Sequence, residues 1–241
     1  MNDHSAHANS FGPAAEIYER GRPEYPAEAL DWLLPAGRPR VVDRGAGTGK
    51  LTRQIARRGL EVTAVDPSEG MLGQLTLAVP GVPALIGSGE SIPLPDGSAD
   101  AVLVAQAWHW VDPARAVPEI ARVLAPGGRL GLVWNLRDES VPWVRRLGEV
   151  IGNQESERQT TVGEPFGPVE LAEFRWSVRM GPERLIDMVA SRSSIILLPA
   201  AERAALLNEV RRLIATHPDL VGRTEFAMPY RTECARATLP A

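Results

Sequence analysis

The chain has 241 residues, 44% of them hydrophobic and 23% charged, and its formal net charge is -4. This length suits one large α/β domain, and the acidic balance argues against a nucleic-acid partner. The single cysteine, Cys234, excludes an intrachain disulfide, and the sequence contains neither a signal-peptide pattern nor a run of about 18 apolar residues. We therefore expect a cytoplasmic protein that has no membrane partner.

The composition along the chain predicts a single domain. Residues 1–10 are polar and rich in His, Asn and Ser, which is typical of a disordered tail. Residues 11–241 are expected to form the domain, with a core at 36–136 and a completing, substrate-side segment at 137–241. Ahead of the core, the apolar spacing over 11–34 predicts two short helices.

Short apolar runs alternate with helical spacing through the core. Continuous apolar runs indicate strands covered on both faces, and their alternation with helices indicates a parallel sheet with right-handed crossovers. Gly127 and Gly128 are expected to form the turn into the fifth strand. The predicted strands are 40–43, 61–65, 82–86, 101–105 and 129–134, and the predicted helices are 48–58, 67–78 and 113–124.

The pattern becomes looser after Asn135. The segment 191–194 is predicted to end a helix, where Arg192 is expected to be solvated. The other predicted elements are helices at 141–151, 182–191 and 199–216, strands at 171–180 and 224–236, and a polar loop at 154–168.

A glycine-rich turn joins the first predicted strand to the helix that follows it. Residues 41–50 read VVDRGAGTGK, in which the glycines permit close approach of a ligand and the helix N-terminus favours a polar or anionic group. A dinucleotide fingerprint needs a third glycine where Lys50 stands, and a phosphate-binding loop needs a glycine where Arg44 stands. Both spacings fail, so we expect the turn to hold a nucleotide-like ligand of another kind.

Asp66 ends the second predicted strand, 21 residues after Gly45. In related sheets, an acidic residue about 20 residues beyond such a turn binds the ribose hydroxyls. Asp66 could instead cap the helix that begins near Pro67. Together with the glycine turn, its position favours the ribose contact.

These motifs, followed by GSGESIPLPDGSAD at 87–100, resemble the type 11 small-molecule methyltransferases, a class I family that uses S-adenosyl-L-methionine. The resemblance extends over about residues 18–136. It implies a doubly wound, mostly parallel seven-stranded α/β sheet whose last two strands form an antiparallel hairpin.

The resemblance also implies a set of cofactor contacts. Asp43 would reach the amino group, Asp66 the ribose hydroxyls, and Met71 would pack near the adenine. Similar proteins carry an acid where Ser88 stands, so adenine recognition would use Ser88, neighbouring backbone groups or the Glu90 side chain. The full predicted set is Asp43, Gly45, Ala46, Gly47, Gly49, Asp66, Pro67, Met71, Ser88, Gly89, Glu90 and Gln106.

Arg44 is a second departure, because similar sequences have an apolar residue between Asp43 and Gly45. A buried guanidinium without a partner is costly. The alternatives are an ion pair with a carboxylate, a stem that reaches solvent, and weak cofactor binding. We hypothesise a buried or half-buried ion pair.

The residues after the fourth and fifth predicted strands are expected to face the acceptor, because ligands of doubly wound sheets bind outside the carboxyl ends of the strands. His109 is the candidate general base, with a structural histidine as the alternative. Trp108, Asn135 and Arg137 are the candidate substrate contacts, although one of the tryptophans in this segment is expected to pack in the core.

The predicted function is transfer of a methyl group to an oxygen or nitrogen of a small molecule. Ahead of the sheet, Tyr18 and Arg22 are candidates for the methionine carboxylate, or alternatively end a surface helix. The competing functions are a cofactor-binding protein of the same fold with weak or lost catalysis, and a nicotinamide-dependent oxidoreductase, which the failed fingerprint disfavours. No metal is expected, and a homodimer is retained as a hypothesis.

Overall fold

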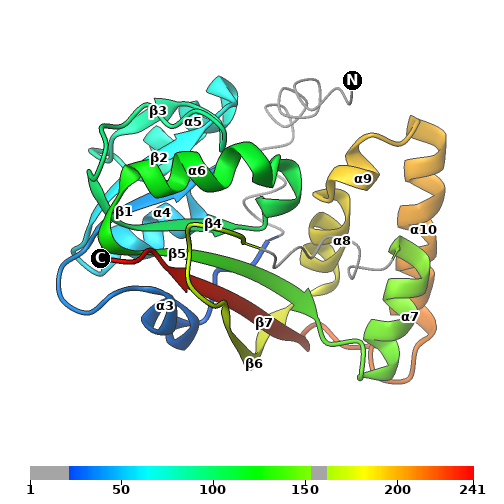
Figure 1. Cartoon of the computed structure of the whole chain (residues 1–241). Coiled ribbons are helices and arrows are strands. Elements are labelled where there is room, and N and C mark those ends of the chain that lie inside the picture. Colours follow the sequence, from blue (N-terminus) through cyan, green and yellow to red (C-terminus); the bar gives the residue numbers. More distant parts are fainter. Residues whose placement is uncertain (1–21, 153–161) are drawn as a thin grey trace.

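The structure is a computed structural model that describes residues 22–152 and 162–241. A seven-stranded sheet with the order β3-β2-β1-β4-β5-β7-β6 forms its centre (Figure 1). Strands β1 to β5 are parallel, whereas β7 runs antiparallel to both β5 and β6, which confirms the predicted arrangement. The strands are β1 (Arg40–Arg44), β2 (Glu61–Asp66), β3 (Ala84–Ile86), β4 (Ala99–Ala105), β5 (Leu124–Arg137), β6 (Glu170–Met180) and β7 (Phe226–Thr238).

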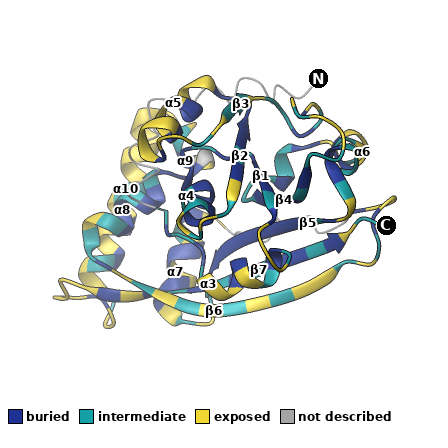
Figure 2. Ribbon diagram, turned by 90° about the vertical axis from the view of Figure 1, so that its left-hand side faces the viewer, coloured by how far each residue is buried: buried dark blue, intermediate teal, exposed yellow. Residues whose placement is uncertain are grey.

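Helices cover both faces of the parallel strands. On one face α3 and α4 pack around Val41 and Leu103, and on the other α6 packs around Val42 and Val102. Successive strand residues point to opposite faces, so these strands are buried on both sides, as Figure 2 shows and as their continuous apolar runs predict. The helices of this part are α3 (Ala27–Leu33), α4 (Lys50–Arg57), α5 (Glu69–Ala78), the 3-10 helix η1 (Trp108–Trp110) and α6 (Pro113–Val123).

A second group of helices lies beside the antiparallel end of the sheet (Figure 1). Its apolar faces form a core with residues of β6 and β7, among them Met180, Met228 and Tyr230. Its longest member is α10, which buries only Val210 and Leu213 and is otherwise largely exposed (Figure 2). We call this group the helical lobe; it comprises α7 (Pro142–Ile151), α8 (Pro182–Ala190), α9 (Ser193–Ile196) and α10 (Ala200–Thr216).

Local sequence signals set the start of two helices that follow strands. The Ser68 hydroxyl accepts a hydrogen bond from the Met71 N–H at the start of α5. The Asp112 carboxylate accepts one from the Ala114 N–H at the start of α6, where Pro113 is the first helical residue. These caps fix where the segments after β2 and η1 end.

The structure corrects two predictions about the antiparallel side of the sheet. β5 begins at Leu124, which pairs with Ala99 before a register shift brings Arg129 opposite Ala101. Gly127 and Gly128 therefore lie within an irregular part of β5 rather than in a turn before it. The last two strands are antiparallel neighbours, but α8, α9 and α10 separate them in the chain, so they do not form a hairpin.

Other predictions fall at the ends of elements or outside the described residues. Of the two helices predicted over 11–34, α3 is observed, and the other lies outside the described residues, as do the tail at 1–10 and the first half of the loop at 154–168. The predicted helix end at 191–194 is confirmed to within one residue, because α8 ends at Ala190 with Ser191 as its C-cap; the short α9, which was not predicted, follows it.

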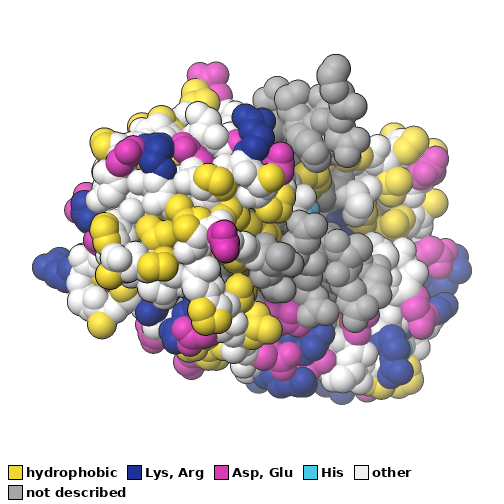
Figure 3. All heavy atoms as spheres, viewed as in Figure 1, with side chains coloured by type: hydrophobic (Ala, Val, Ile, Leu, Met, Phe, Trp, Pro, Cys, Tyr) yellow, Lys and Arg dark blue, Asp and Glu magenta, His cyan; other side chains and the backbone are white. Residues whose placement is uncertain are grey.

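The surface carries charged side chains of both signs. Positive and negative side chains are interspersed on the face drawn in Figure 3. Within residues 22–152 and 162–241, no helix has the length and apolar character that a membrane span needs.

Candidate functional site

The glycine-rich turn leaves the carboxyl end of β1 and leads into α4. Gly45 and Gly47 have φ values of 76° and 55°, in the left-handed region that glycine tolerates. A Cβ atom on Gly45 would lie 2.8 Å from Cβ of Ala107, whereas one on Gly47 would meet no atom within 4 Å. The turn therefore packs tightly against the end of β4 and leaves open space beside Gly47.

Asp66, at the end of β2, holds this turn in place. Its Oδ2 accepts a hydrogen bond from the Gly47 N–H at 2.9 Å, and its Oδ1 accepts one from the Ser68 N–H at 2.9 Å. Burial raises the pKa of Asp66, and these two hydrogen bonds oppose the rise. The carboxylate thus fixes the ends of β1 and β2 relative to each other, and its contact with ribose stays a prediction.

Asp43 is fully buried at the start of the turn. Its Oδ2 accepts a hydrogen bond from the Thr52 hydroxyl at 2.6 Å, but its Oδ1 has no hydrogen-bond partner in the described part of the chain. Burial raises the pKa of Asp43 to about 7. Because Asp43 also lines the neighbouring cavity, its Oδ1 can accept a hydrogen bond from a ligand there.

The cavity lies between the glycine turn and the helical lobe. The space between its atoms, with the open solvent at its mouth included, is about 680 Å³. From the predicted set it is lined by Asp43, Gly45, Ala46, Gly47, Gln106, Asn135 and Arg137. Its other lining residues are Arg22, Pro23, Tyr25, Thr48, Lys50, Leu51, Ala105, Met188, Arg192 and Tyr230.

Gln106 and Asn135 form the wall at the ends of β4 and β5. Gln106 has a φ of 56°, which is uncommon for a residue with a side chain, and its Nε2 donates to the Asn135 carbonyl at 3.0 Å. The Asn135 side chain donates to the Glu24 carbonyl at 3.1 Å and accepts from the Thr232 hydroxyl at 2.6 Å. These bonds connect the segment before α3 with β5 and β7, so the wall is fixed from both sides.

The remaining predicted cofactor residues surround the neighbouring ends of β2 and β3. Asp66 and Pro67 follow β2, Met71 lies buried in the first turn of α5, and Gly49 is the N-cap of α4. Ser88, Gly89 and Glu90 form the turn after β3. None of these residues lines the cavity described above, so their contacts with a cofactor stay predictions.

Arg44 lies on the face of β1 opposite Asp43 and is 5% exposed. Its Nη1 donates to the Ala107 carbonyl at 3.4 Å, and burial lowers its pKa, an effect that Glu90 and Asp66 oppose. No carboxylate of the described residues comes within the 4.0 Å of an ion pair with Arg44. The expected ion pair is therefore wrong: the two acids act on Arg44 only from longer range.

The guanidinium of Arg44 lies over Gly89. A Cβ atom on Gly89 would come within 2.4 Å of Nη2 of Arg44 and 2.6 Å of its Cζ. Since real Cβ contacts are never this short, an arginine at position 44 requires glycine at position 89 or a shift of the guanidinium. The guanidinium of Arg44 and the glycine at position 89 are therefore matched to each other.

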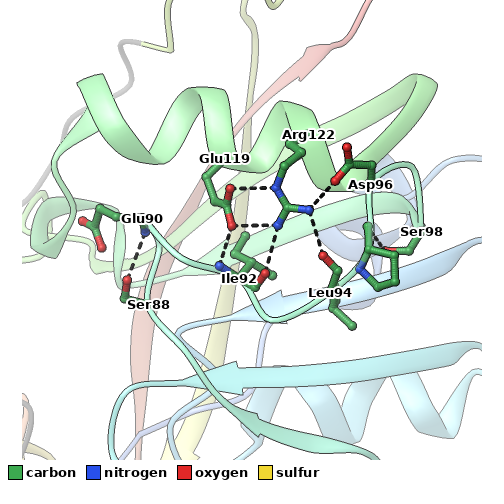
Figure 4. A network of polar contacts seen from close by, with 9 residues as sticks. Ser88, Glu90, Ile92, Leu94, Asp96, Ser98, Glu119 and Arg122 are labelled. Carbon is green, nitrogen blue, oxygen red and sulfur yellow. Dashed lines mark hydrogen bonds and ion pairs between the residues drawn. The ribbon is translucent and has the colours of Figure 1, made fainter.

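The loop that begins with Ser88 is held by Arg122 of α6 (Figure 4). Arg122 donates to the carbonyls of Ile92 at 3.0 Å and Leu94 at 2.9 Å, and it forms an ion pair with Glu119 at 2.8 Å. Glu119 in turn accepts a hydrogen bond from the Ile92 N–H at 2.7 Å. The loop after β3 is thereby fastened to α6.

The structure places the two candidates from η1 away from the cavity. Trp108 is fully buried in the core under α6, so the predicted substrate contact is corrected to a packing role. His109 does not line the cavity, and its ring lies against Trp110 with 4.8 Å between centroids. A catalytic role for His109 therefore finds no geometric support in the cavity, and it stays a prediction.

Two guanidiniums reach the cavity near the helical lobe. Arg137 ends β5 and is 2% exposed, with an ion pair to Glu139 at 3.3 Å. Arg192 follows α8 and is 6% exposed, so the prediction of a solvated Arg192 is wrong. Tyr230 also lines the cavity and is not among the predicted site residues. The pairing of β7 with β5, which places Tyr230 opposite Arg137, is the signal that could have indicated it. Nothing in the sequence around Arg192 indicates that its side chain turns inward.

Comparisons with known proteins identify the family and the fold. The family model described as "Methyltransferase domain" matches residues 42–132. The chain is 58% identical over 232 residues to an uncharacterized methyltransferase of Mycobacterium tuberculosis, covering 95% of this chain and 96% of that protein. It resembles the structure of a putative type II methyltransferase from Anaeromyxobacter dehalogenans, with a TM-score of 0.66 and 25% identity over 91% of this chain and 99% of the other. An N-methyltransferase from Haemonchus contortus, solved with S-adenosylhomocysteine, has a TM-score of 0.55 at 17% identity, covering 95% of this chain and 58% of that chain.

Proposed function

The chain belongs to the class I methyltransferase family, and we propose that it transfers a methyl group from S-adenosyl-L-methionine to an oxygen or nitrogen of a small molecule. The observation that carries this proposal is the buried Oδ1 of Asp43, which has no partner among the described residues and lies beside the open space at Gly47. A buried acceptor without a partner is costly unless a ligand satisfies it. The amino group of S-adenosylmethionine is a donor of the required kind.

The residues around the turn fit the rest of this donor. Gly47 leaves room for it against the backbone, and Asp66 is fixed at the end of β2, where ribose recognition is expected. Arg22 lines the same cavity and would bind the methionine carboxylate. The structure of an N-methyltransferase of similar fold with S-adenosylhomocysteine supports this choice of donor.

The chain's own contribution is to bind and orient the reactants. When bound, S-adenosylmethionine supplies a methyl group on a positively charged sulfur. The wall formed by Gln106 and Asn135 is fixed by hydrogen bonds, so it can hold an acceptor in one orientation beside the turn. Orientation of two reactants in one cavity removes much of the entropic cost of a bimolecular step.

The composition supports a proposal for the protein's compartment and for the class of its substrate. We place it in the cytoplasm, because a single cysteine suits a reducing compartment. An acidic chain with interspersed surface charges suits a small-molecule substrate better than a nucleic acid.

Calorimetric titration with S-adenosylhomocysteine tests the donor. We expect binding at micromolar concentration, and at least tenfold weaker binding by Asp43→Ala, because the donor's amino group loses its acceptor. Asp219→Asn, which changes an exposed carboxylate outside the cavity, is the matched control and should bind as the wild type does. Failure of the wild type to bind at micromolar levels, or binding of NADH instead, contradicts the proposal.

A second candidate is a cofactor-binding protein without catalysis. The buried Arg44, matched by Gly89, favours it, because this guanidinium lies next to the turn expected to hold the adenine. Methyl transfer from labelled S-adenosylmethionine to an extracted metabolite separates the two candidates. Tight binding without any transfer supports the second.

A further inference from the structure

Strand β6 (Glu170–Met180) forms one edge of the sheet. It spans 11 residues, whereas β3 at the opposite edge spans 3. Within residues 22–152 and 162–241 its one neighbouring strand is β7, which pairs with it over its whole length, and Figure 2 shows β6 along the lower margin of the molecule. The outer side of such a strand presents backbone N–H and C=O groups that can pair with a further strand. The edge at β6 is therefore a template for a second chain.

The two faces of β6 differ in character. Side chains alternate between the faces of a strand, and those at the odd-numbered positions of β6 are exposed. Those at even positions from 172 to 178 are apolar and half-buried: Ala172 and Phe174 pack on the core beneath α3, and Trp176 and Val178 pack on the core of the helical lobe. A strand placed beside β6 would cover the open side of this apolar row, and that burial favours pairing.

The exposed face of β6 carries a glutamate and an arginine two positions apart. Nε of Arg175 lies 2.9 Å from Oε1 of Glu173, and the two side chains are 62% and 37% exposed. Arg175 also pairs with Asp138 at 3.2 Å, and Glu173 with Arg231 at 3.3 Å. Exposed pairs of this kind keep their contact with solvent and contribute little within one chain, so both groups remain accessible to a second chain. Because an antiparallel copy reverses the order of the two residues, each would meet the opposite charge.

We propose that two copies of this chain form a dimer in which their β6 strands pair antiparallel about a two-fold axis at Phe174. In this register Glu173 lies opposite Arg175 of the partner subunit, and by symmetry the pair occurs twice. On the other face Phe174 lies opposite Phe174 of the partner subunit, and Ala172 lies opposite Trp176 of the partner subunit, so apolar side chains also meet. A surface that is complementary to itself in this way is what a two-fold dimer requires.

Neighbouring registers fit less well. An axis one position to either side of Phe174 brings two glutamates or two arginines opposite each other, which destabilises an antiparallel pair. An axis at Trp176 brings Glu173 opposite Arg179, whose carbonyl accepts a hydrogen bond from the Arg184 side chain at 3.4 Å. The axis at Phe174 leaves that carbonyl outside the paired strands.

Charge reversal tests the interface in the full chain, with the Kd of the dimer measured by sedimentation at micromolar concentration. We expect Glu173→Arg and Arg175→Glu each to raise this Kd at least tenfold, because the facing charges are then alike. An equimolar mixture of the two variants should dimerise with a Kd within threefold of the wild type, since the facing charges are again opposite. Glu202→Arg and Arg203→Glu, at exposed positions of α10, are the matched controls and should each dimerise as the wild type does.

Three results of this experiment overturn the proposal. The first is a wild-type chain that stays monomeric at every concentration. The second is a dimer whose Kd neither variant changes, and the third is a dimer that mixing the variants does not restore, because the subunits then meet at another surface. If either charge variant does not fold, cross-linking of the two strands decides.

Disulfide cross-linking tests the register. Glu173→Cys with an affinity tag is mixed with untagged Arg175→Cys and oxidised by dissolved oxygen, while the native Cys234, 2% exposed, is too buried to compete. Directly opposite positions have Cβ atoms about 5 Å apart, so we expect the tagged chain to cross-link to the untagged one at least fivefold faster than in a mixture of Glu173→Cys with Arg179→Cys. Faster reaction of the second mixture, or no cross-link in either, overturns the axis at Phe174.

Discussion

The two sides of the cavity differ in the groups they present. On the side of the glycine turn, the cavity is lined by the turn itself and by the buried carboxylate of Asp43, while Asp66, outside the lining, holds the turn in place. On the side of the helical lobe, Arg137 and Arg192 come from positions far apart in the chain. Under the proposed function, the compact motif would recognise the methyl donor, and side chains from distant elements would contact the acceptor.

The largest expected effect concerns the carboxylate side. Burial raises the pKa of Asp43 from 3.8 to about 7, so the folded protein holds a proton that the unfolded chain releases. Stability should therefore be highest below pH 4 with respect to this group and fall by about 4 kcal/mol in all as the pH rises from 4 through 7. Asp43→Asn should remove most of this dependence in urea unfolding measured from pH 5 to pH 8. A variant with an unchanged pH dependence would show that Asp43 is ionised at little cost.

The second prediction concerns the contact beneath the expected adenine site. Gly89→Ala should cost about 2 kcal/mol, because the new Cβ would meet the Arg44 guanidinium. In the background of Arg44→Leu the same change should cost less than about 0.5 kcal/mol, since the guanidinium is gone. Arg44→Leu alone should stabilise the protein by about 1 kcal/mol, because it removes a buried charge that has no ion pair. Equal costs of Gly89→Ala in the two backgrounds would refute the matching.

The third prediction compares the two sides directly. Asp43→Asn should weaken S-adenosylhomocysteine binding about tenfold, which is 1.4 kcal/mol, and Arg192→Met should leave it unchanged. The reverse pattern should hold for the acceptor KM measured at saturating methyl donor. If both variants weaken both ligands alike, the division of the cavity into a donor side and an acceptor side is wrong.

The smallest expected effect lies in the loop after β3. Arg122→Met removes the hydrogen bonds to the Ile92 and Leu94 carbonyls and the ion pair with Glu119. Because Arg122 is partly exposed, we expect a loss of about 0.5–1 kcal/mol and a two- to threefold weaker binding of S-adenosylhomocysteine. Arg146→Met, at an exposed ion pair on α7, is the control. A loss of the same size in both would show that the loop does not depend on Arg122.

Much of the fold could be predicted because its signals are local. The apolar runs at β1, β2 and β4 are continuous since both faces of these strands are covered, and that pattern is visible without knowing what covers them. The predicted fifth strand is shorter than the observed β5, because the first residues of β5 pair with β4 through a register shift that no sequence pattern marks. The short helix α9 and the burial of Arg192 after α8 were not predicted for a similar reason: both depend on what packs against this segment.

The sequence by itself determined the donor side of this protein. The glycines, Asp43 and Asp66 occur at a fixed spacing, and the backbone conformations they require are properties of those residues in any context. Only the tertiary structure decided the acceptor side. Arg192 carries no local signal: its side chain is expected in solvent, but it lines the cavity. Trp108 is expected to contact the substrate, but it is buried in the core. Side-chain direction there is set by packing between β5, β7 and α8, which are distant in the sequence, so the charge of the acceptor site emerges only when the sheet and the helical lobe come together.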